Sequence, residues 1–365
     1  MKILFVGYLG RGQTSGMRCE ALRRLGHDVQ AVDVGQVWRG ASYPARQLQQ
    51  LTLRGPRIDA LNTAILAAAR EYQPALVWAE KQEYLRPSTL NEMRQRRVTT
   101  LHYNPDPYFS LTWKRTSLAD ACLPLYDVVV VTKRYELGSY SAQGCAHVMY
   151  SPLGFDPVGH APPRHLNGYH RDVAFVGGWE PRRERLLGIA QQVASDISVW
   201  GYGWSIAQGS RVNPLRALRL GRLAPGHRVY LGPPSDQLEP AIKMGEGVNG
   251  EIYEEAYSNA IAGSRIALGL LREVCPDQHT TRTFEIPAIG AFMLADRSQE
   301  HLEFFEEGRE AEFFGSDDEY LDKLRFYLAN DDARKRVAIA GHDRCMRSGY
   351  SYDDRIRHVM LELAR

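Results

Sequence analysis

The amino-acid sequence predicts an α/β protein made of two Rossmann-like, doubly wound domains. Two observations support this: short apolar runs typical of buried strands alternate with amphipathic helical stretches, and the alternation restarts after a segment rich in proline and glycine. A chain of 365 residues is long enough for two such domains. The expected parts are an N-terminal domain (1–155), a linker (156–170), a C-terminal domain (171–348) and a C-terminal helix (349–365) packing back toward the N-terminal domain.

In the first half, Lys2–Val6 is almost continuously apolar, as expected for a parallel strand covered on both faces. A glycine-containing loop, an amphipathic helix and a second strand follow it. A helical stretch over about Ile58–Tyr72 precedes a strand in "PALVWAE". Further strands are expected in "RVTTLHYNPDP", "YDVVVVTKRYE" and "CAHVMYSPLGFDP".

The linker "DPVGHAPPRHLNGYHR" carries His160, His165 and His170, which recur every five residues. A helix does not bring that spacing onto one face, and the prolines interrupt regular structure. We therefore expect no metal site there.

The second half repeats the alternation, with a strand in "DVAFVGG", a helix in "EPRRERLLGIAQQVA" and a strand in "DISVWGYG". The arginine-rich "SRVNPLRALRLGRLAPGHRVYLGPP" is expected to form an irregular loop or helix before another strand. "YEEAYSNAIAGSRIALGLL" predicts a helix and a strand. Helices are expected over about Asp317–Asn330 and Asp332–Arg347, and a last one from near Tyr352.

Composition excludes several classes of protein. The net charge of +2 gives no strong electrostatic footprint for nucleic acid, so none is expected as a partner. Five cysteines lie far apart without a CxxC pair, which argues against structural zinc or disulfides and fits a reducing cytoplasm. Met1 leads directly into a strand, and no apolar run approaches the roughly 18 residues of a membrane span. We expect a cytoplasmic protein with no transmembrane segment.

The stretch "HTTRTFEIPAIGAFMLAD" places a polar cluster before an apolar helix and strand. Pro287 lacks a backbone donor and belongs near a helix start, so the helix is expected from near Phe284 to Gly290. Ala291–Leu294 then predict a short buried strand ending at Asp296.

The unpaired N–H groups at the start of this helix favour anions, so Thr280 and Thr281 are candidates for binding phosphate oxygens. The alternative is that the threonines only cap the helix, with Arg282 and Glu285 as a solvated pair.

Four motifs resemble the CgeB-like, glycosyltransferase-group-1 family. They are Arg282-Thr283-Phe284-Glu285, Gly290-Ala291, Gly308-Arg309-Glu310 and Tyr352-Asp353-Asp354-Arg355. The resemblance covers roughly residues 171–360, and the N-terminal half follows it only in outline. It implies the GT-B architecture, in which two Rossmann-like domains face each other across a cleft.

The resemblance also implies roles for individual residues of the C-terminal domain, which would hold the nucleotide. Glu285 would accept hydrogen bonds from the ribose diol, with Thr280, Thr281 and Arg282 beside it. Related retaining enzymes carry a second acidic residue eight positions earlier. That position is Asp277 here, a candidate catalytic residue in contact with the sugar.

Two glycine turns supply further candidates for donor binding. After the turn containing Gly178, Arg183 lies on the first turns of a helix, where a cation is unfavourable unless an anion compensates it. The departing diphosphate is one such anion, and a solvated face paired with acidic neighbours is the alternative. In "WGYGW", Gly201 allows close approach of a nucleotide, and the aromatic residues either stack on its base or pack in the core.

The N-terminal loop "GRGQTSG" contains Gly10, Gly12, Ser15 and Gly16. In a GT-B protein this loop would face the cleft and approach the transferred sugar or the acceptor. It also resembles a dinucleotide fingerprint, one residue off the usual spacing, with Asp33 as the ribose acid. That resemblance supports an NAD(P)-dependent oxidoreductase as an alternative.

"LHYNPDPYF" places His102 and Asp106 at the carboxyl end of a strand, where α/β sites lie. Either is a candidate general base for an inverting enzyme, and Asp106 is also an ordinary turn residue.

We therefore expect a hexosyltransferase-type enzyme that moves a sugar from a nucleotide-sugar donor to an unknown acceptor hydroxyl. The nucleotide-sugar would be a co-substrate, and neither a metal nor a further cofactor is expected. The alternatives are the oxidoreductase and a non-catalytic protein that binds sugar nucleotides.

Overall fold

The computed structural model describes residues 1–165, 168–204 and 248–364. The arginine-rich segment from Ser210 to Pro234 lies outside these residues. The contacts group the described chain into two compact units. Unit 1 consists of Met1–Pro152 and 352–364, and unit 2 consists of the described residues of 153–351.

Unit 1 contains a six-stranded sheet of order β2-β1-β3-β4-β5-β6, in which each strand pairs in parallel with its neighbours. The register places Val6 opposite Val32 on one side and Ala79 on the other. The strands are β1 (Lys2–Gly7), β2 (Asp28–Asp33), β3 (Leu76–Glu80), β4 (Thr99–Asn104), β5 (Val128–Val131) and β6 (Val148–Tyr150).

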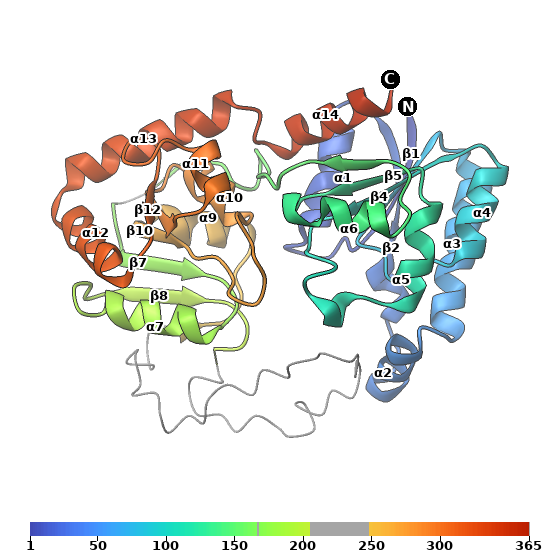
Figure 1. Cartoon of the computed structure of the whole chain (residues 1–365), viewed down its shortest axis with the longest axis horizontal. Helices are drawn as coiled ribbons and strands as arrows, with labels where there is room; N and C mark the ends of the chain where they lie inside the picture. The colour runs from blue at the N-terminus through green and yellow to red at the C-terminus, as the bar shows by residue number, and fades with distance from the viewer. Residues whose placement is uncertain (166–167, 205–247, 365) are drawn as a thin grey trace. The chain divides into compact units, whose positions relative to one another are not determined.

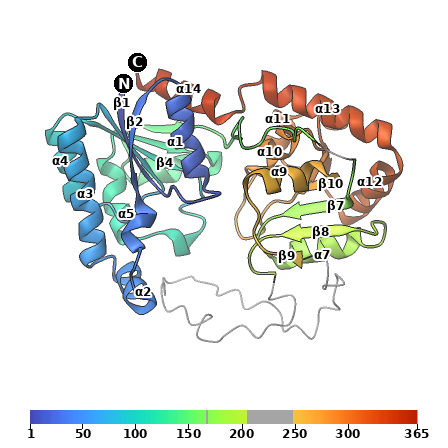
Figure 2. The same ribbon diagram turned by 180° about the vertical axis from the view of Figure 1, so that it is seen from behind.

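Helices cover both faces of this sheet, and α2 lies apart from it with no buried residue. The helices of unit 1 are α1 (Thr14–Arg24), α2 (Tyr43–Thr52), α3 (Pro56–Tyr72), α4 (Pro87–Gln95), α5 (Ser117–Cys122), α6 (Leu137–Ala142) and α14 (Tyr352–Leu363), with short 3-10 helices at Val34–Trp38, Thr112–Lys114, Leu123–Leu125 and Arg134–Glu136. Side chains alternate along β1, so Leu4 and Val6 pack with α3 and α4 while Ile3 and Phe5 pack with α1 and α14. Figures 1 and 2 show these two layers from opposite sides.

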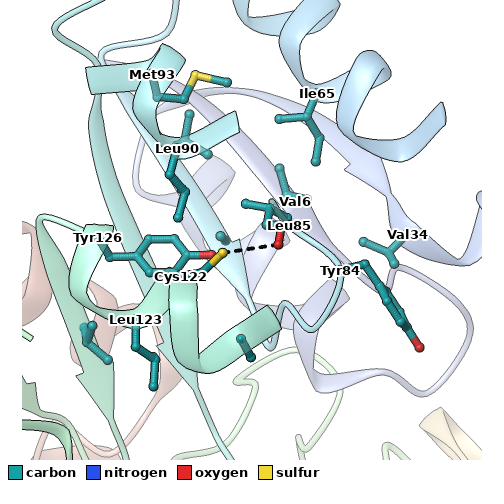
Figure 3. Close-up of a cluster of buried hydrophobic side chains, with 14 of the residues drawn as sticks. Val6, Val34, Ile65, Tyr84, Leu85, Leu90, Met93, Cys122, Leu123 and Tyr126 are labelled. Atoms are coloured by element: carbon teal, nitrogen blue, oxygen red, sulfur yellow. Dashed lines mark hydrogen bonds between the residues drawn. The ribbon is translucent and has the colours of Figure 1, made fainter. Parts of the chain in front are cut away.

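The core between the sheet and α3, α4 and α5 is apolar and closely filled (Figure 3). Val6, Ile65 and Leu90 bring together the sheet and two helices. The Cys122 Sγ donates a hydrogen bond to the Leu85 carbonyl at 3.2 Å, so this buried thiol is satisfied within the core.

Unit 2 contains a second six-stranded sheet of order β12-β11-β10-β7-β8-β9, whose neighbouring strands are also parallel. The strands are β7 (Arg171–Val176), β8 (Ile197–Trp200), β9 (Val248–Asn249), β10 (Ser264–Gly269), β11 (Met293–Asp296) and β12 (Glu312–Phe314). The predicted fold class, two doubly wound parallel sheets, is confirmed.

The helices of unit 2 also form two layers. They are α7 (Pro181–Ala190), α9 (Glu254–Ala262), α10 (Arg282–Ala288), α11 (Gln299–Phe304), α12 (Asp317–Ala329) and α13 (Asp331–Arg347). On one face Phe175 packs with α7 and α12, and on the other Val176 packs with α9 and α10.

Local chemistry fixes the start of α12. The Ser316 hydroxyl accepts from the Glu319 backbone N–H at 3.2 Å, and Asp317, Asp318 and Glu319 place negative charge on the first turn. Both features stabilise a helix N-terminus.

Helix α10 begins two residues earlier than predicted, at Arg282 instead of near Phe284. The backbone N–H groups of Phe284 and Glu285 both bond to the Thr281 carbonyl, which starts the first turn there. Gly290 has φ +82° and ends the helix as expected. The Ala291 N–H bonds back to the Ile286 carbonyl, so β11 starts at Met293 instead of Ala291.

Helix α14 belongs to unit 1. Its residues Tyr352, Ile356 and Val359 are buried against α1 and the sheet, and the two helices lie side by side in both views (Figures 1 and 2). Arg18 of α1 is buried in an ion pair with Glu80, and its guanidinium lies between the rings of Tyr103, at 4.8 Å, and Tyr352, at 4.9 Å.

No helix in the described part of the chain is both long and apolar enough to cross a bilayer.

Candidate functional site

The order of the unit 2 sheet reverses between β7 and β10. The chain leaves β7 toward β8 on one side and leaves β10 toward β11 on the other. In parallel α/β sheets, ligands bind outside the carboxyl ends of the strands at such a point. The predicted donor-binding residues Gly178, Arg183 and Arg282 all lie at this edge of unit 2.

Arg183 bridges the two loops of this edge. Its Nη1 donates to the Gly178 carbonyl at 2.9 Å and its Nη2 to the Leu270 carbonyl at 3.1 Å, so it joins the segments that follow β7 and β10. Its Nε is buried and makes no hydrogen bond within the described residues; the nearest carboxylate, of Glu180, lies 3.9 Å away. Burial lowers the pKa of Arg183, and Glu180 opposes that effect. A guanidinium stays protonated, so this is a buried cation with an unused donor.

Gly201 is required by the close approach of two turns, because it has φ +145° and a Cβ there would lie 2.1 Å from the Gly177 carbonyl oxygen. A Cβ on Gly178 would lie 2.7 Å from the Tyr202 ring, the outer end of an exposed side chain. Packing alone therefore explains Gly201 but not Gly178. Trp200 is buried in the core, whereas Tyr202 is 71% exposed beside Gly178.

Glu285 is a buried carboxylate held by three side chains. Its Oε2 accepts from the Tyr257 hydroxyl at 2.9 Å and is paired with Arg282, whose Nε donates to the Val176 carbonyl at the end of β7. The His160 Nε2 lies 3.6 Å from Oε1, beyond hydrogen-bond length. Burial raises the pKa of Glu285, but Arg282, His160 and Tyr257 together lower it below its ordinary value. The Glu285 side of this ion pair is buried, so Arg282 and Glu285 are not the solvated pair that the sequence left as an alternative.

The His160 tautomer follows from its partners. Its Nδ1 accepts from the Asp156 backbone N–H at 2.9 Å, so the proton of the neutral ring is on Nε2 and points toward Glu285. The Ser258 hydroxyl donates to the Gly159 carbonyl at 2.9 Å and fastens this turn to α9.

The threonines at the start of α10 have different partners. The Thr280 N–H donates to the Thr283 Oγ1 at 3.0 Å, and this hydroxyl contacts the His301 Nε2 at 2.8 Å. His301 Nδ1 lies 2.6 Å from the Asp296 carbonyl, which only accepts, so Nε2 accepts from Thr283. Thr281 Oγ1 accepts from Arg282 at 3.2 Å. The Thr280 N–H is thus already used by the protein.

Asp277 is a buried carboxylate in an ion pair. Arg272 donates to its Oδ2 from Nε at 2.8 Å and from Nη2 at 2.6 Å. Arg272, in the loop that follows β10, is therefore the counter-ion of Asp277.

In unit 1, the segment Gly10–Gly16 follows β1 at the carboxyl edge of the sheet; the expected loop ends at Gln13, and Ser15 and Gly16 lie on the first turn of α1. Gly12 has φ +72°, which glycine adopts readily. The Ser15 hydroxyl is buried, and a Cβ on Gly7 would lie 2.4 Å from it. Asp33 Oδ1 accepts from the backbone N–H groups of Leu9, at 3.2 Å, and Gly35, at 2.9 Å. The proposed ribose acid of the oxidoreductase alternative therefore supports the loop itself.

His102 and Asp106 line one small pocket at the ends of β3 and β4. Asp106 is paired with Lys81 at 2.5 Å and Lys114 at 2.7 Å. Burial raises the pKa of Asp106, but the two lysines hold it well below its ordinary value. Burial lowers the pKa of His102 to about 4, so the ring is neutral at physiological pH.

Three buried polar atoms along this pocket make no hydrogen bond within the described residues. They are His102 Nδ1, Gln82 Oε1 and the Tyr126 hydroxyl. Buried polar atoms are normally paired, so such a group suits a polar ligand or water.

Sequence reasoning missed Tyr257, His160, Lys81 and Lys114. Lys81 directly follows a predicted strand, and that position is a signal we did not use. The others give no signal of their own, because their contacts arise when separate segments pack together. Within the described ranges, no group of three His, Cys, Asp or Glu residues is arranged to hold a metal ion.

Residues 182–360 match the family model described as glycosyl transferase-like. The match begins in α7 and ends in α14, so the part of the chain that is similar to this family includes Arg183, Asp277 and Glu285. It does not include Gly178 or the candidates of unit 1 before residue 182. No curated protein matches the chain by sequence.

Solved structures resemble the whole chain. Sucrose-phosphate synthase from Thermosynechococcus elongatus has a TM-score of 0.65 at 12% identity, covering 100% of this chain and 98% of its own. Anabaena HepE in complex with UDP-glucose has a TM-score of 0.62 at 12% identity, covering 100% and 99%. A UDP-forming α,α-trehalose-phosphate synthase from Burkholderia xenovorans has 0.59 at 12%, covering 100% and 98%.

These likenesses confirm the predicted GT-B fold. The family match of residues 182–360 supports a transferase and does not favour the oxidoreductase.

Proposed function

We propose that the chain is a CgeB-like, hexosyltransferase-type enzyme of the cytoplasm. It moves a sugar from a nucleotide-sugar donor to an acceptor hydroxyl without a metal ion. Unit 2 holds the nucleotide and unit 1 holds the acceptor. The observation that carries this proposal is the buried Arg183 at the point where the unit 2 sheet reverses.

Arg183 suits the diphosphate of the donor. Its two Nη groups are fixed by backbone carbonyls, so the guanidinium is held in place before any ligand arrives, and Nε remains to donate. A preorganised cation stabilises the charge that develops on a departing diphosphate. Arg282, anchored on the Val176 carbonyl, adds a second positive charge at the same edge. Two guanidinium groups here take the place that a metal ion has in other transferases.

Glu285 suits the ribose of the same nucleotide. Its Oε2 is committed to Tyr257 and Arg282, whereas Oε1 lies 3.6 Å from the His160 Nε2. An ionised carboxylate oxygen accepts well from hydroxyl groups. The UDP-glucose bound by HepE and the UDP-forming trehalose-phosphate synthase support a UDP-hexose as the first donor to test.

The pocket of unit 1 suits a polar acceptor. The His102 Nδ1 is buried and makes no hydrogen bond within the part of the chain that the structure describes, so it would accept one from an acceptor hydroxyl. Asp106, ionised between Lys81 and Lys114, is a weak base, so we assign it to holding the two lysines at the pocket. Asp277, paired with Arg272, would contact the transferred sugar.

The test is a screen of UDP- and GDP-sugars, followed through release of nucleoside diphosphate and the anomeric configuration of the product. Arg183→Ala is expected to weaken binding of the nucleoside diphosphate by roughly 10- to 150-fold, from the loss of one charged hydrogen bond worth about 1.5–3 kcal/mol. Arg185→Ala is the matched control, because Arg185 lies on the same helix and pairs with Asp317 at the surface. Equal affinities of wild type and Arg183→Ala would remove Arg183 from the site.

Two further readouts distinguish the alternatives. Activity that survives EDTA supports the metal-independent reaction, and activity restored only by added Mg²⁺ or Mn²⁺ contradicts it. A rise in melting temperature with NAD(P) and not with nucleotide-sugars would favour an oxidoreductase. Binding of a nucleotide-sugar with neither transfer nor hydrolysis would favour a non-catalytic binding protein.

A further inference from the structure

Helix α2 has its apolar side on the outside. Tyr43 is 65% exposed, Leu48 61% and Leu51 48%, and no residue of this ten-residue helix is buried. Pro44, Leu48 and Leu51 follow the i, i+4, i+7 spacing of a single helix face. Figures 1 and 2 show α2 at one extremity of unit 1, beside the start of α3.

The polar side of α2 faces the body of unit 1. Gln49 Oε1 accepts from the Arg57 backbone N–H at 2.9 Å, and the Gln49 side chain fills the space beside Gly55. The guanidinium of Arg46 lies 5.9 Å from the centre of the Trp38 ring. A helix of a globular protein normally turns its apolar stripe toward the core, so α2 is reversed.

The surroundings of this apolar face are basic. The segment from Val34 to Ile58 contains four arginines (Arg39, Arg46, Arg54 and Arg57) and no acidic residue. The acids at its ends have partners, since Asp33 accepts from backbone N–H groups and Asp59 pairs with Arg86.

Other exposed apolar side chains lack this combination. Leu302 of α11 and Leu361 of α14 are exposed on separate helices. Ile339 and Met346 lie seven residues apart on α13, but both acidic and basic residues occur along that helix. Scattered exposed apolar residues are normal, whereas a contiguous apolar face within a cationic segment marks a binding surface.

We propose that α2 docks on the anionic surface of a phospholipid membrane, with Pro44, Leu48 and Leu51 among the acyl chains and Arg39 and Arg54 at the headgroups. A short helix with an apolar face and flanking arginines lies in the plane of a membrane interface and does not span it. The charge complementarity selects anionic lipid, because each arginine near such a surface adds attraction that a neutral surface does not provide. The proposal goes beyond glycosyl transfer and does not depend on it.

The test is sedimentation of the full chain with vesicles of phosphatidylcholine alone and of phosphatidylcholine with phosphatidylglycerol, at two salt concentrations. The wild type is expected to bind the anionic vesicles, more weakly at high salt, and the neutral vesicles poorly. Leu48→Gln with Leu51→Gln is expected to lower the partition coefficient by roughly tenfold or more, since two apolar side chains no longer enter the interface. The matched control, Leu302→Gln with Leu361→Gln, should bind like the wild type.

Arg39→Gln with Arg54→Gln is a second variant that leaves the leucines in place. It should lose binding to anionic vesicles and show a weaker salt dependence. Far-UV circular dichroism and thermal melting check that the variants are folded. Failure of the wild type to bind anionic vesicles, or binding retained by the leucine variant, overturns the proposal. A concentration-dependent dimer that the wild type forms and the leucine variant does not also overturns the proposal, because a second copy would then cover α2.

Discussion

Glu285 is a buried side chain that carries a negative charge. Tyr257, Arg282 and His160 come from three different segments and together keep its carboxylate ionised. An isolated carboxylate in this place would be costly, since a buried charge needs pairing or hydrogen bonds. The ionised state of the proposed ribose-binding carboxylate therefore depends on the packing of the segments around it.

The first prediction concerns Glu285→Gln, which keeps the shape but replaces one acceptor oxygen with a donor. Nucleoside diphosphate affinity, measured by calorimetry, should fall roughly 10- to 150-fold from a loss of about 1.5–3 kcal/mol. A 2′,3′-dideoxy nucleotide should bind wild type and variant almost alike. Stability should also fall, by about 1–3 kcal/mol, because Arg282 loses its counter-ion.

Tyr257→Phe is the control for Glu285→Gln, since it removes a neutral donor to the same carboxylate and leaves the charge. If Glu285→Gln lost stability but bound the full nucleotide normally, Glu285 would be a structural residue only.

The second prediction concerns His102 and pH. Burial lowers its pKa to about 4, whereas an imidazole in an unfolded chain has a pKa of about 6.5. Between these values the unfolded chain binds a proton that the folded chain does not. The free energy of unfolding therefore falls as pH falls from about 6.5 to about 4, by up to about 1.4 kcal/mol per pH unit.

His102→Leu should flatten this slope in urea unfolding at a series of pH values. Tyr126→Phe changes the ring that packs on His102 at 4.9 Å and adds no titrating group, so it should keep the slope. An unchanged slope in His102→Leu would assign the acid sensitivity to other groups, such as His160, whose pKa burial also lowers.

At the scale of elements, α14 completes the core of unit 1. Its buried residues cover the same face of the sheet as α1, and Tyr352 closes over the Arg18 guanidinium. Asp353 adds an ion pair with Arg24 at 2.5 Å. Without α14 this face of the sheet would be partly exposed.

The third prediction is that Ile356→Ala lowers the free energy of unfolding by about 2–4 kcal/mol, because the isoleucine is fully buried and its removal leaves a cavity. Leu361→Ala on the same helix should cost less than about 0.5 kcal/mol, because Leu361 is exposed. Urea unfolding monitored by circular dichroism measures both. Equal small losses would show that α14 is not part of the cooperative core.

The elements that sequence predicted best are those whose apolar residues face the core. The helix expected over 58–72 is α3, which buries one face, and the strand expected in "PALVWAE" is β3, which is buried throughout. Helix α2 was missed because its apolar periodicity faces outward and the segment has no neighbouring core strand. The limits of α10 shifted because backbone bonds to Thr281 and Ile286 decide them, and composition does not reveal such bonds.

Sequence identified candidate site residues in two ways, by their position after a predicted strand and by motif resemblance. Arg183 and Gly178 follow a recognisable strand and turn, and motif resemblance located Glu285. Tyr257 and His160 could not be inferred, because their positions beside Glu285 depend on how α9 and the turn after Asp156 pack.

At the scale of the whole molecule, each unit has its own sheet and its own core. Ligand binding to one unit is therefore expected to protect that unit first. Because we propose that unit 2 binds the nucleotide, the unit that the nucleotide protects tests this assignment.

The fourth prediction is that UDP slows amide hydrogen exchange in the loops after β7 and β10 and in α10. The loops after β1 and β3 in unit 1 should show little change. At 100 times the dissociation constant, binding adds about 2.7 kcal/mol of stability to the unit that binds. Protection confined to the loop Gly10–Gly16 would place the nucleotide in unit 1 and contradict the proposal.

The path of the chain also has a practical meaning for protein engineering. The described chain enters unit 2 after Pro152 and returns to unit 1 at Tyr352, and a parallel β-bridge joins Phe155 to Ser351 beside these crossings. Unit 2 is thus an inserted domain whose two ends meet. We expect that a gene fragment for 153–351 folds when expressed alone and that a short glycine–serine segment reconnects Pro152 to Tyr352 in the host domain. Separate proteins for the two units would open each of them to NMR and to exchange with other transferases.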